Sequence, residues 1–270
     1  EIVFGDWSSD VCSSDRAISG RGCIDGNSCA LFGGLLPGER AEGYRFKRGN
    51  FPIPAWRPGQ MVWFCNSRDI SVCDVALTNA PYWTLMFFGC ERVQARGLRI
   101  SNPPETANGD GIDVDCCRGV TISDCIMATG DDCITLRGNS RALGREQPCE
   151  NVTVSNCVLR TPCNCVRVGV GDGTIRQCVL SNLVMGEART GVNVVSRYSA
   201  RSLRGACIED VQFANLSMDV IMPLQIIHGE DPKDGAGIRN LAFRGVRARA
   251  AAGFYIGGNP GNPVRNLLLS

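Results

Sequence analysis

Three aspartates in the middle of the chain have the types and the spacing that acid–base chemistry needs. Asp110 is followed 21 positions later by the adjacent pair Asp131 and Asp132. Clustered carboxylates repel each other, so one of them holds its proton more tightly, and an acid and a base can coexist near neutral pH. If 21 residues make one turn of a repeating fold, Asp131 returns beside Asp110 at about one strand spacing, roughly 4.8 Å.

A repeat of this kind runs through most of the sequence. It consists of an apolar residue and a second apolar residue five positions later, with alternation between them as in Val152-Thr153-Val154. Alternation with a period of two is typical of strands that have one buried face. The pairs are Ile70 and Val75, Val93 and Leu98, Val120 and Cys125, Val152 and Cys157, Cys178 and Leu183, Val211 and Leu216, and Leu241 and Val246, and an eighth run begins at Leu267. Residues that tolerate a left-handed backbone often precede the second position and predict a turn there: Asp74, Asp124, Asn156, Asn182 and Asn215.

Short strands, a regular return and the absence of helical periodicity predict an all-β fold, a right-handed parallel β-helix. A β-sandwich is the alternative, but it requires tighter hairpin signals and leaves the constant five-residue offset without a reason. The first members of the pairs are 23 to 33 positions apart, which places insertions at the turns. One insertion, Gly138–Pro148, directly follows the strand that carries the acid pair, and we expect it to form a wall of a cleft.

We expect residues 16–270 to form one β-helix domain that is truncated at both ends. Residues 1–15 include the stretch DWSSDVCSSD, from Asp6 to Asp15, which is the translation of a common sequencing adapter. We therefore expect these fifteen residues to be a non-native tail and leave them out of the fold argument.

Composition and charge exclude several classes of function. The chain has 28 basic and 27 acidic residues, so it lacks the electrostatic footprint of a protein that binds nucleic acid or a membrane surface. It contains no run of 18 apolar residues, and we expect no transmembrane helix. Cys125, Cys157 and Cys178 occupy apolar positions of the repeat, where free thiols behave as small buried hydrophobic groups. The remaining cysteine clusters, Cys116-Cys117 and Cys163-Asn164-Cys165, lack the spacing of a structural zinc site, so we expect no metal and no cofactor.

From about Ile18 onward the chain resembles glycoside hydrolase family 28, the polygalacturonase-type pectinases. The phrases that carry the resemblance are Gly20-Arg-Gly-Cys-Ile-Asp-Gly26, Arg57-Pro58, Thr78-Asn-Ala-Pro-Tyr-Trp83, Asn108-Gly-Asp-Gly-Ile-Asp113 and Gly130-Asp-Asp-Cys133. The family has Asn-Thr-Asp where Asn108-Gly109-Asp110 stands, so the middle residue differs and the acid is kept. The resemblance implies a parallel β-helix and an inverting glycoside hydrolase that acts on a pectin-related polysaccharide or another glycan.

The resemblance also implies roles for the three acids. Asp131 is expected to be the general acid, while Asp110 and Asp132 hold the attacking water, because an inverting glycosidase needs one protonated carboxyl and one carboxylate that activates water. Adjacent residues on an ideal strand point to opposite faces, so Asp131 and Asp132 reach one cleft only where the backbone departs from ideal geometry. Two other functions stay open: a calcium-dependent polysaccharide lyase, with Asp113, Asp115, Asp131 and Asp132 as ligands, and a non-catalytic carbohydrate-binding β-helix.

Two family motifs are absent, and their absence bears on the substrate. Asn164 stands where the family has the histidine of Gly-His-Gly, and Asn193-Val194-Val195 stands where it has Arg-Ile-Lys, the grip on a substrate carboxylate. His228, the only histidine, lies further along the chain and is expected at the surface or in a groove. A carboxylate without a cationic partner is costly to desolvate, so we expect weak or no activity on plain polygalacturonic acid.

The remaining expectations concern the wider site and the setting of the protein. Besides the acids, the side chains expected to bind substrate are Asn108, Asp113, Asn164, Arg167, Asn193, Arg197 and Tyr198. Tyr255 is a further candidate for stacking against a sugar ring. We expect a monomer whose partner is a polysaccharide or oligosaccharide, and an extracellular or periplasmic location.

Overall fold

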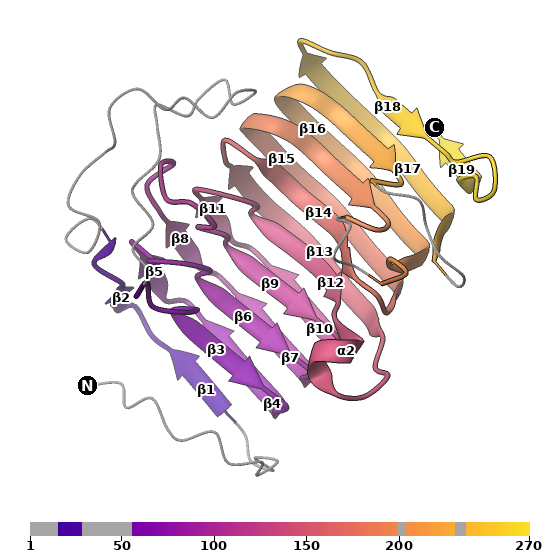
Figure 1. Ribbon diagram of the computed structural model, residues 1–270. Helices are drawn as coiled ribbons and strands as arrows, with labels where there is room; N and C mark the ends of the chain where they lie inside the picture. The colour runs from indigo at the N-terminus through magenta and orange to yellow at the C-terminus, as the bar shows by residue number, and fades with distance from the viewer. Residues whose placement is uncertain (1–15, 29–55, 199–202, 230–235) are drawn as a thin grey trace.

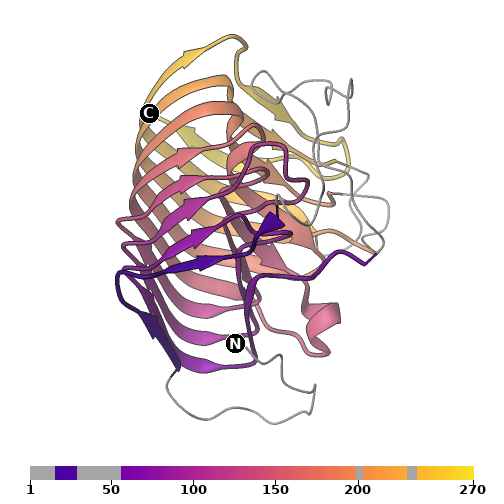
Figure 2. The ribbon, with the colours of Figure 1, turned by 90° about the vertical axis from the view of Figure 1, so that its left-hand side faces the viewer.

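The computed structural model describes residues 16–28, 56–198, 203–229 and 236–270. The predicted non-native tail, residues 1–15, lies outside the described residues. The chain winds as a right-handed parallel β-helix whose successive rungs run from β1 at one end to β19 at the other (Figures 1 and 2). Every pairing between named strands is parallel, which confirms the predicted fold class.

Three stacks of strands form the sides of the β-helix. The first stack comprises β1 (Arg16–Ser19), β4 (Arg68–Cys73), β7 (Glu91–Arg96), β10 (Arg118–Ser123), β13 (Cys149–Arg160), β15 (Thr174–Val195), β16 (Cys207–Ile227), β17 (Gly237–Ala250) and β19 (Arg265–Leu269). The second comprises β2 (Cys23–Asp25), β5 (Ala76–Thr78), β8 (Arg99–Ser101), β11 (Ile126–Ala128) and the later parts of the long strands β13, β15, β16 and β17. The third comprises β3 (Val62–Cys65), β6 (Leu85–Phe88), β9 (Ile112–Asp115), β12 (Ile134–Gly138), β14 (Asn164–Gly171), the ends of β15 and β16, and β18 (Tyr255–Gly257).

The predicted repeat sets the register of the first stack. The first members of the eight runs pair in one line from Ile70 to Leu267. Five of these first members, Val93, Val120, Val152, Val211 and Leu241, are all buried, as expected of the buried face of the strands. Cys125, Cys157 and Cys178 are buried as well, and they are free thiols, as predicted. Further along the rungs the rings of Phe213 and Phe243 stack with their centroids 4.5 Å apart.

The turn between the first and second stacks repeats one backbone geometry. The residue before each second apolar position has a left-handed φ: Asp74 at 60°, Asp124 at 58°, Asn156 at 57°, Asn182 at 55° and Asn215 at 55°. The Asn156 amide donates to Asp124 Oδ1 over 3.3 Å, and Asn182 donates to Asn156 Oδ1 over 3.1 Å. This ladder joins successive rungs, which explains why Asn and Asp recur at these positions.

One short helix, α2 (Ser140–Leu143), interrupts the strands after β12. Within the described ranges, no helix is long and apolar enough to span a bilayer.

Candidate functional site

The candidate site lies where the third stack begins, at the amino-terminal ends of β9, β12 and β14. The Gly111 N–H donates to the carbonyl oxygen of Asp132 over 2.9 Å, and the Cys133 N–H donates to that of Asn164 over 3.0 Å. Since Ile112 pairs with Ile134 and Ile134 pairs with Val166, the register places Asp110, Asp132 and Asn164 on three successive rungs.

The predicted partner of Asp110 was wrong by one residue. The register between β9 and β12 spans 22 positions, so Asp132 lies opposite Asp110, while the Asp131 N–H faces the carbonyl oxygen of Gly109 at 3.4 Å. The difference arises because residues 129–133 form a bend before β12, with the Thr129 hydroxyl donating to the Asp131 carbonyl oxygen over 2.6 Å. This bend is the departure from strand geometry that adjacent acids need in order to share one site.

Gly130 precedes the acid pair because the bend leaves no room for a side chain. A Cβ at this position would lie 2.4 Å from the carbonyl oxygen of Thr106 and 2.8 Å from that of Pro103. Both contacts are far inside van der Waals distance, so only glycine allows this backbone approach. The glycine of the Gly130-Asp131-Asp132 motif is therefore a packing requirement of the loop that presents the acids.

Asp132 is buried and ionised. Its Oδ1 accepts from the side-chain amide of Asn164 over 2.5 Å and from the backbone N–H of the same residue over 3.2 Å. Its Oδ2 accepts from Nε of Arg167, which is also buried. Burial acts to raise the pKa of Asp132, but the charge and hydrogen bonds of Arg167, with those of Asn164, outweigh it and hold the pKa below its usual value.

Asp110 is held in the opposite protonation state. Its side chain is buried, and its Oδ1 has no hydrogen-bond partner among the described residues. Burial is the largest cause that raises its pKa well above the usual value, and the charges of Asp113, Asp131 and Asp132 raise it further. The site therefore keeps a protonated carboxyl and an ionised carboxylate on adjacent rungs, in the manner that pairs of acids adopt in enzymes.

Asp113 and Asp115 follow on β9, and Arg137 of β12 lies between them. The Nη1 of Arg137 donates to Asp113 Oδ1 over 3.0 Å, and its Nε lies 3.7 Å from Asp115 Oδ2. Burial raises the pKa of Asp113 to about 7, although Arg137 acts against the rise. Asp115 also accepts from the backbone and side chain of Asn139 at 2.8 Å and 2.6 Å. These two acids are thus already engaged by a cation and an amide, which disfavours them as calcium ligands.

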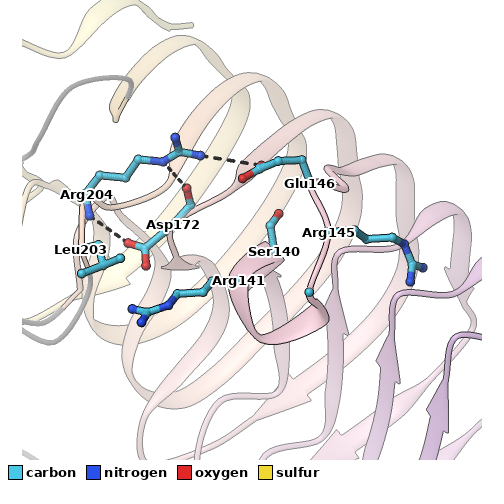
Figure 3. Close-up of a pocket in the computed structure, with 8 residues that line it drawn as sticks. Ser140, Arg141, Arg145, Glu146, Asp172, Leu203 and Arg204 are labelled. Atoms are coloured by element: carbon cyan, nitrogen blue, oxygen red, sulfur yellow. Dashed lines mark hydrogen bonds and ion pairs between the residues drawn. The ribbon is translucent and has the colours of Figure 1, made fainter. Parts of the chain in front are cut away.

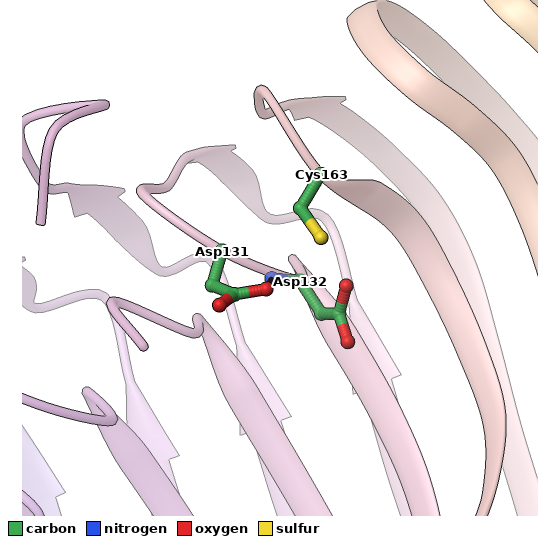
Figure 4. A group of neighbouring side chains, drawn as sticks. All are labelled: Asp131, Asp132 and Cys163. Atoms are coloured by element: carbon green, nitrogen blue, oxygen red, sulfur yellow. Dashed lines mark hydrogen bonds between the residues drawn. The ribbon is translucent and has the colours of Figure 1, made fainter. Parts of the chain in front are cut away.

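Asp131, Asp132 and Cys163 come together on neighbouring rungs, with potential ligand atoms within 4.8 Å of one another (Figure 4). This is the one arrangement among the described residues that could hold a metal ion. The Asp132 carboxylate is already bound by Arg167, and Arg189 Nη2 lies 3.6 Å from the Cys163 sulfur. Burial raises the pKa of the Cys163 thiol well above its usual value, which keeps it protonated. A thiol beside two guanidinium groups is a poor environment for a cation.

A cavity of about 440 Å³ opens beside Asp131 on the carboxy-terminal side of the acids. Of the predicted substrate-binding residues, Arg167, Asn193 and Tyr198 line it. The guanidinium of Arg167 lies 4.7 Å from the centroid of the Tyr198 ring, which is half exposed. Three further polar residues line the cavity and were not predicted from the sequence: Arg189, Thr190 and Gln225. The repeat could have identified Thr190 and Gln225, because they pair in register with Asn164 and Asn193.

The other predicted binding residues occupy different places. Asn164 is buried beneath the cavity. Arg197 is partly buried against Gly205 and does not line the cavity. His228 directly follows β16, and partial burial lowers its pKa. Tyr255 is half exposed on β18, opposite Gln225.

Asn108 lies on the amino-terminal side of the acids in an aromatic setting. Its Oδ1 accepts from Nη2 of Arg57 over 3.1 Å, and the Arg57 guanidinium lies 4.3 Å from the centroid of the Tyr82 ring. The rings of Tyr82 and Trp83 stack at 4.9 Å, and Arg137 lies over Trp83 at 4.2 Å. Two aromatic rings and two arginines therefore stack on one another on this side of the acids.

The insertion Gly138–Pro148 does not border the cavity beside Asp131. Its residues line a separate pocket of about 510 Å³ with Asp172, Leu203 and Arg204 (Figure 3). There the Nε of Arg204 donates to the Asp172 carbonyl oxygen over 2.6 Å, and its Nη2 lies 3.7 Å from Glu146 Oε2. The insertion leaves β12 at its carboxy-terminal end, about four residues or roughly 13 Å beyond the start of that strand. The expected cleft wall is therefore a wall of this second pocket.

Fold and site together define a parallel β-helix that carries an acid cluster at the start of one strand stack. The model of the family "Glycosyl hydrolases family 28" matches residues 15–143. A polygalacturonase of Chamaecyparis obtusa is 39% identical over 70 residues, which are 26% of this chain and 14% of that protein. A probable polygalacturonase of Arabidopsis thaliana is 22% identical over 245 residues, which are 88% of this chain and 54% of that protein.

Solved structures show the same fold. A hyperthermoactive exopolygalacturonase from Thermotoga maritima superposes with a TM-score of 0.60 and 19% identity, covering 72% of this chain and 51% of that chain. These comparisons confirm the predicted resemblance to glycoside hydrolase family 28 and to polygalacturonases. The chain spans about half the length, or less, of these three proteins.

Proposed function

We propose that this chain carries the active site of a polygalacturonase-like, inverting glycoside hydrolase that acts on a pectin-related polysaccharide or another glycan. The observation that carries the proposal is the gathering of three acids: Asp110, whose pKa is raised, and Asp132, whose pKa is lowered, lie on adjacent rungs, and Asp131 lines the cavity beside them. A scaffold has no need for this arrangement, because burying carboxylates beside one another is unfavourable.

In the proposed reaction Asp131 is the general acid, since it is the acid that lines the cavity. It donates a proton to the leaving glycosidic oxygen while the bond from the anomeric carbon to that oxygen breaks. A water attacks the anomeric carbon from the opposite face, and the ionised Asp132 accepts the proton of that water. Asp110, kept neutral by burial, hydrogen-bonds to the water and orients it.

Arg167 and Asn164 support this assignment of Asp132 as the base. Their hydrogen bonds fix the carboxylate and keep it ionised. Because Oδ1 already accepts two hydrogen bonds from Asn164, the water hydrogen-bonds to Oδ2. The relatives named as polygalacturonases support a polysaccharide substrate. We expect the protein to act as a monomer outside the cytoplasm, where such a substrate is found.

A product screen tests the proposal. The chain is incubated with a panel of plant and microbial polysaccharides, and new reducing ends are measured beside Asp131→Asn. We expect release from at least one glycan that the variant lowers about a hundredfold, the scale of general acid catalysis. An ultraviolet-absorbing product that requires calcium would instead indicate the polysaccharide lyase. Sugar binding without any product would indicate a non-catalytic binding module.

A further inference from the structure

A chain of side-chain amides leads from the ionised Asp132 into the cavity. The Asn164 amide nitrogen donates to Asp132 Oδ1 over 2.5 Å, so its oxygen faces away from the carboxylate. That oxygen accepts from the amide nitrogen of Asn193 over 3.2 Å. Asn193 is 4% exposed and lines the cavity of about 440 Å³. Its own Oδ1 is buried and has no hydrogen-bond partner among the described residues.

The orientation of both amides follows from the chemistry of their neighbours. An ionised carboxylate can only accept hydrogen bonds, so Asn164 must turn its NH2 group toward Asp132. On its other side Arg189, which can only donate, lies 3.2 Å from Asn164 Oδ1 and requires an oxygen there. Asp132, which only accepts, and Arg189, which only donates, therefore fix the orientation of the Asn164 amide. Asn193 must then present its NH2 group to Asn164, so its own oxygen has no hydrogen-bond partner among the described residues.

An acceptor without a partner at the wall of a cavity selects a ligand that donates. A sugar hydroxyl donates and also accepts, whereas a carboxylate only accepts and would set its lone pairs against those of Asn193 Oδ1. Two of the neighbouring polar groups are also neutral: Thr190 and Gln225 line the cavity, and Gln225 pairs in register with Asn193. Two arginines line it as well, and both are engaged: Arg167 pairs with Asp132, and Arg189 donates to Asn164 Oδ1.

We propose that Asn193 Oδ1 accepts a hydrogen bond from the C6 hydroxyl of a sugar, so that the unit bound beside Asp131 on the carboxy-terminal side is a neutral sugar. The proposal rests on the proposed function for the position of the scissile bond, and it names the class of sugar in this subsite. Asn193 is then a specificity-determining residue. A site built to hydrogen-bond a hydroxyl discriminates strongly against an analogue that cannot supply the bond.

Binding without turnover separates this inference from the proposed reaction. In Asp131→Asn, calorimetry measures the affinity for an α-1,4-linked galactose trimer and for the matching galacturonic acid trimer, which differ only at C6. We expect the neutral trimer to bind roughly tenfold more tightly. Adding Asn193→Ala should weaken the neutral trimer by about tenfold and leave the acidic one unchanged, and Asn193→Lys should reverse the preference. Ile221→Ala, a change at an apolar lining residue, should affect both trimers equally and serves as the control.

Thermal unfolding shows whether the Asn193 variants keep their fold. The inference falls if neither trimer binds, if the acidic trimer binds as tightly as the neutral one, or if that acidic binding is lost in Arg189→Gln. The last result would assign the subsite to a carboxylate held by Arg189. Hydrolysis without a binding preference would leave the proposed function standing and remove the inference, while a preference without hydrolysis would do the reverse.

Discussion

Arg167 and Asp132 form a buried ion pair between β14 and the loop that precedes β12, with the arginine Nε donating to Asp132 Oδ2. The side chains are only 8% and 4% exposed. The pair keeps the candidate base ionised in a place where burial alone would protonate it. It also makes each partner dependent on the other, because a single buried charge without its counterion is strongly destabilising.

Replacing the arginine alone should therefore destabilise the fold. Arg167→Met leaves the Asp132 carboxylate buried without a cation, and we expect the free energy of unfolding at pH 7 to fall by about 3 kcal/mol in urea titrations. The double variant Arg167→Met with Asp132→Asn should recover most of this loss. The matched control is Arg96→Met, which breaks the exposed pair with Asp74 and should cost less than about 1 kcal/mol. Equal losses in the two single variants would contradict a buried pair.

Stability should fall as the pH rises from about 4 to about 7. The pKa of Asp113 rises from 3.8 to about 7 through burial, so in this window the folded state binds more protons than the unfolded state. The stability that this group contributes is fully present below pH 3.8 and is lost as the pH rises through about 7. Urea unfolding at pH 4.5, 6 and 7.5 measures the slope. Asp113→Asn should flatten it, and an unchanged slope in that variant would locate the effect elsewhere.

Replacing Asp110 should change stability and activity in opposite directions. At pH 8 its buried carboxyl is unfavourable to ionise, so Asp110→Asn should raise the melting temperature while lowering turnover by about a hundredfold. Asp131→Asn should lower turnover to a similar degree with little change in melting temperature, because Asp131 is partly exposed. Scanning calorimetry and a reducing-end assay on one substrate provide both measurements. Wild-type turnover in both variants would remove the assigned roles.

Removing side-chain volume from the stacked interior should destabilise the fold. Val152 is buried between Val120 and Cys178 on neighbouring rungs, so Val152→Ala should lower the free energy of unfolding by about 2 kcal/mol. Thr153→Ala changes the next residue, whose side chain is exposed, and should stay near wild type. Similar effects at both positions would mean that Val152 does not face the core.

At Asn182, in the ladder of Asn and Asp side chains at the turns, alanine should destabilise the fold more than glycine does. Asn182 has a φ of 55°, so Asn182→Ala places an ordinary side chain in a left-handed conformation that costs about 1 kcal/mol. Asn182→Gly loses the same hydrogen bonds to Asn156 and Asn215 but not the backbone preference. The difference between the two variants in urea unfolding isolates the backbone effect. Gly97 and Gly245 hold a similar φ on other rungs, which makes the glycine variant a fair reference.

The repeat was readable from the chain because it depends on local patterns. Alternation with a period of two selects strands, the five-residue offset spans one turn, and Asn or Asp marks its left-handed residue. Each of these signals acts over a few neighbours, so Ile70 to Leu267 could be placed in one column without knowledge of the fold. The Gly130-Asp131-Asp132 motif likewise indicated the acid site, because its residue types already carry the chemistry.

The residue that each acid faces, and its protonation state, followed only from the three-dimensional structure. A register of 22 rather than 21 set Asp132, not Asp131, opposite Asp110. The partners of Asp132 come from β14, and the cavity beside Asp131 takes its wall from β15 and β16. The strands, the turns and the acids could be predicted from the chain alone, since those follow from local conformational preference and residue type. Burial and the distance between charges belong to pairs of residues far apart in the chain, and only folding brings such pairs together.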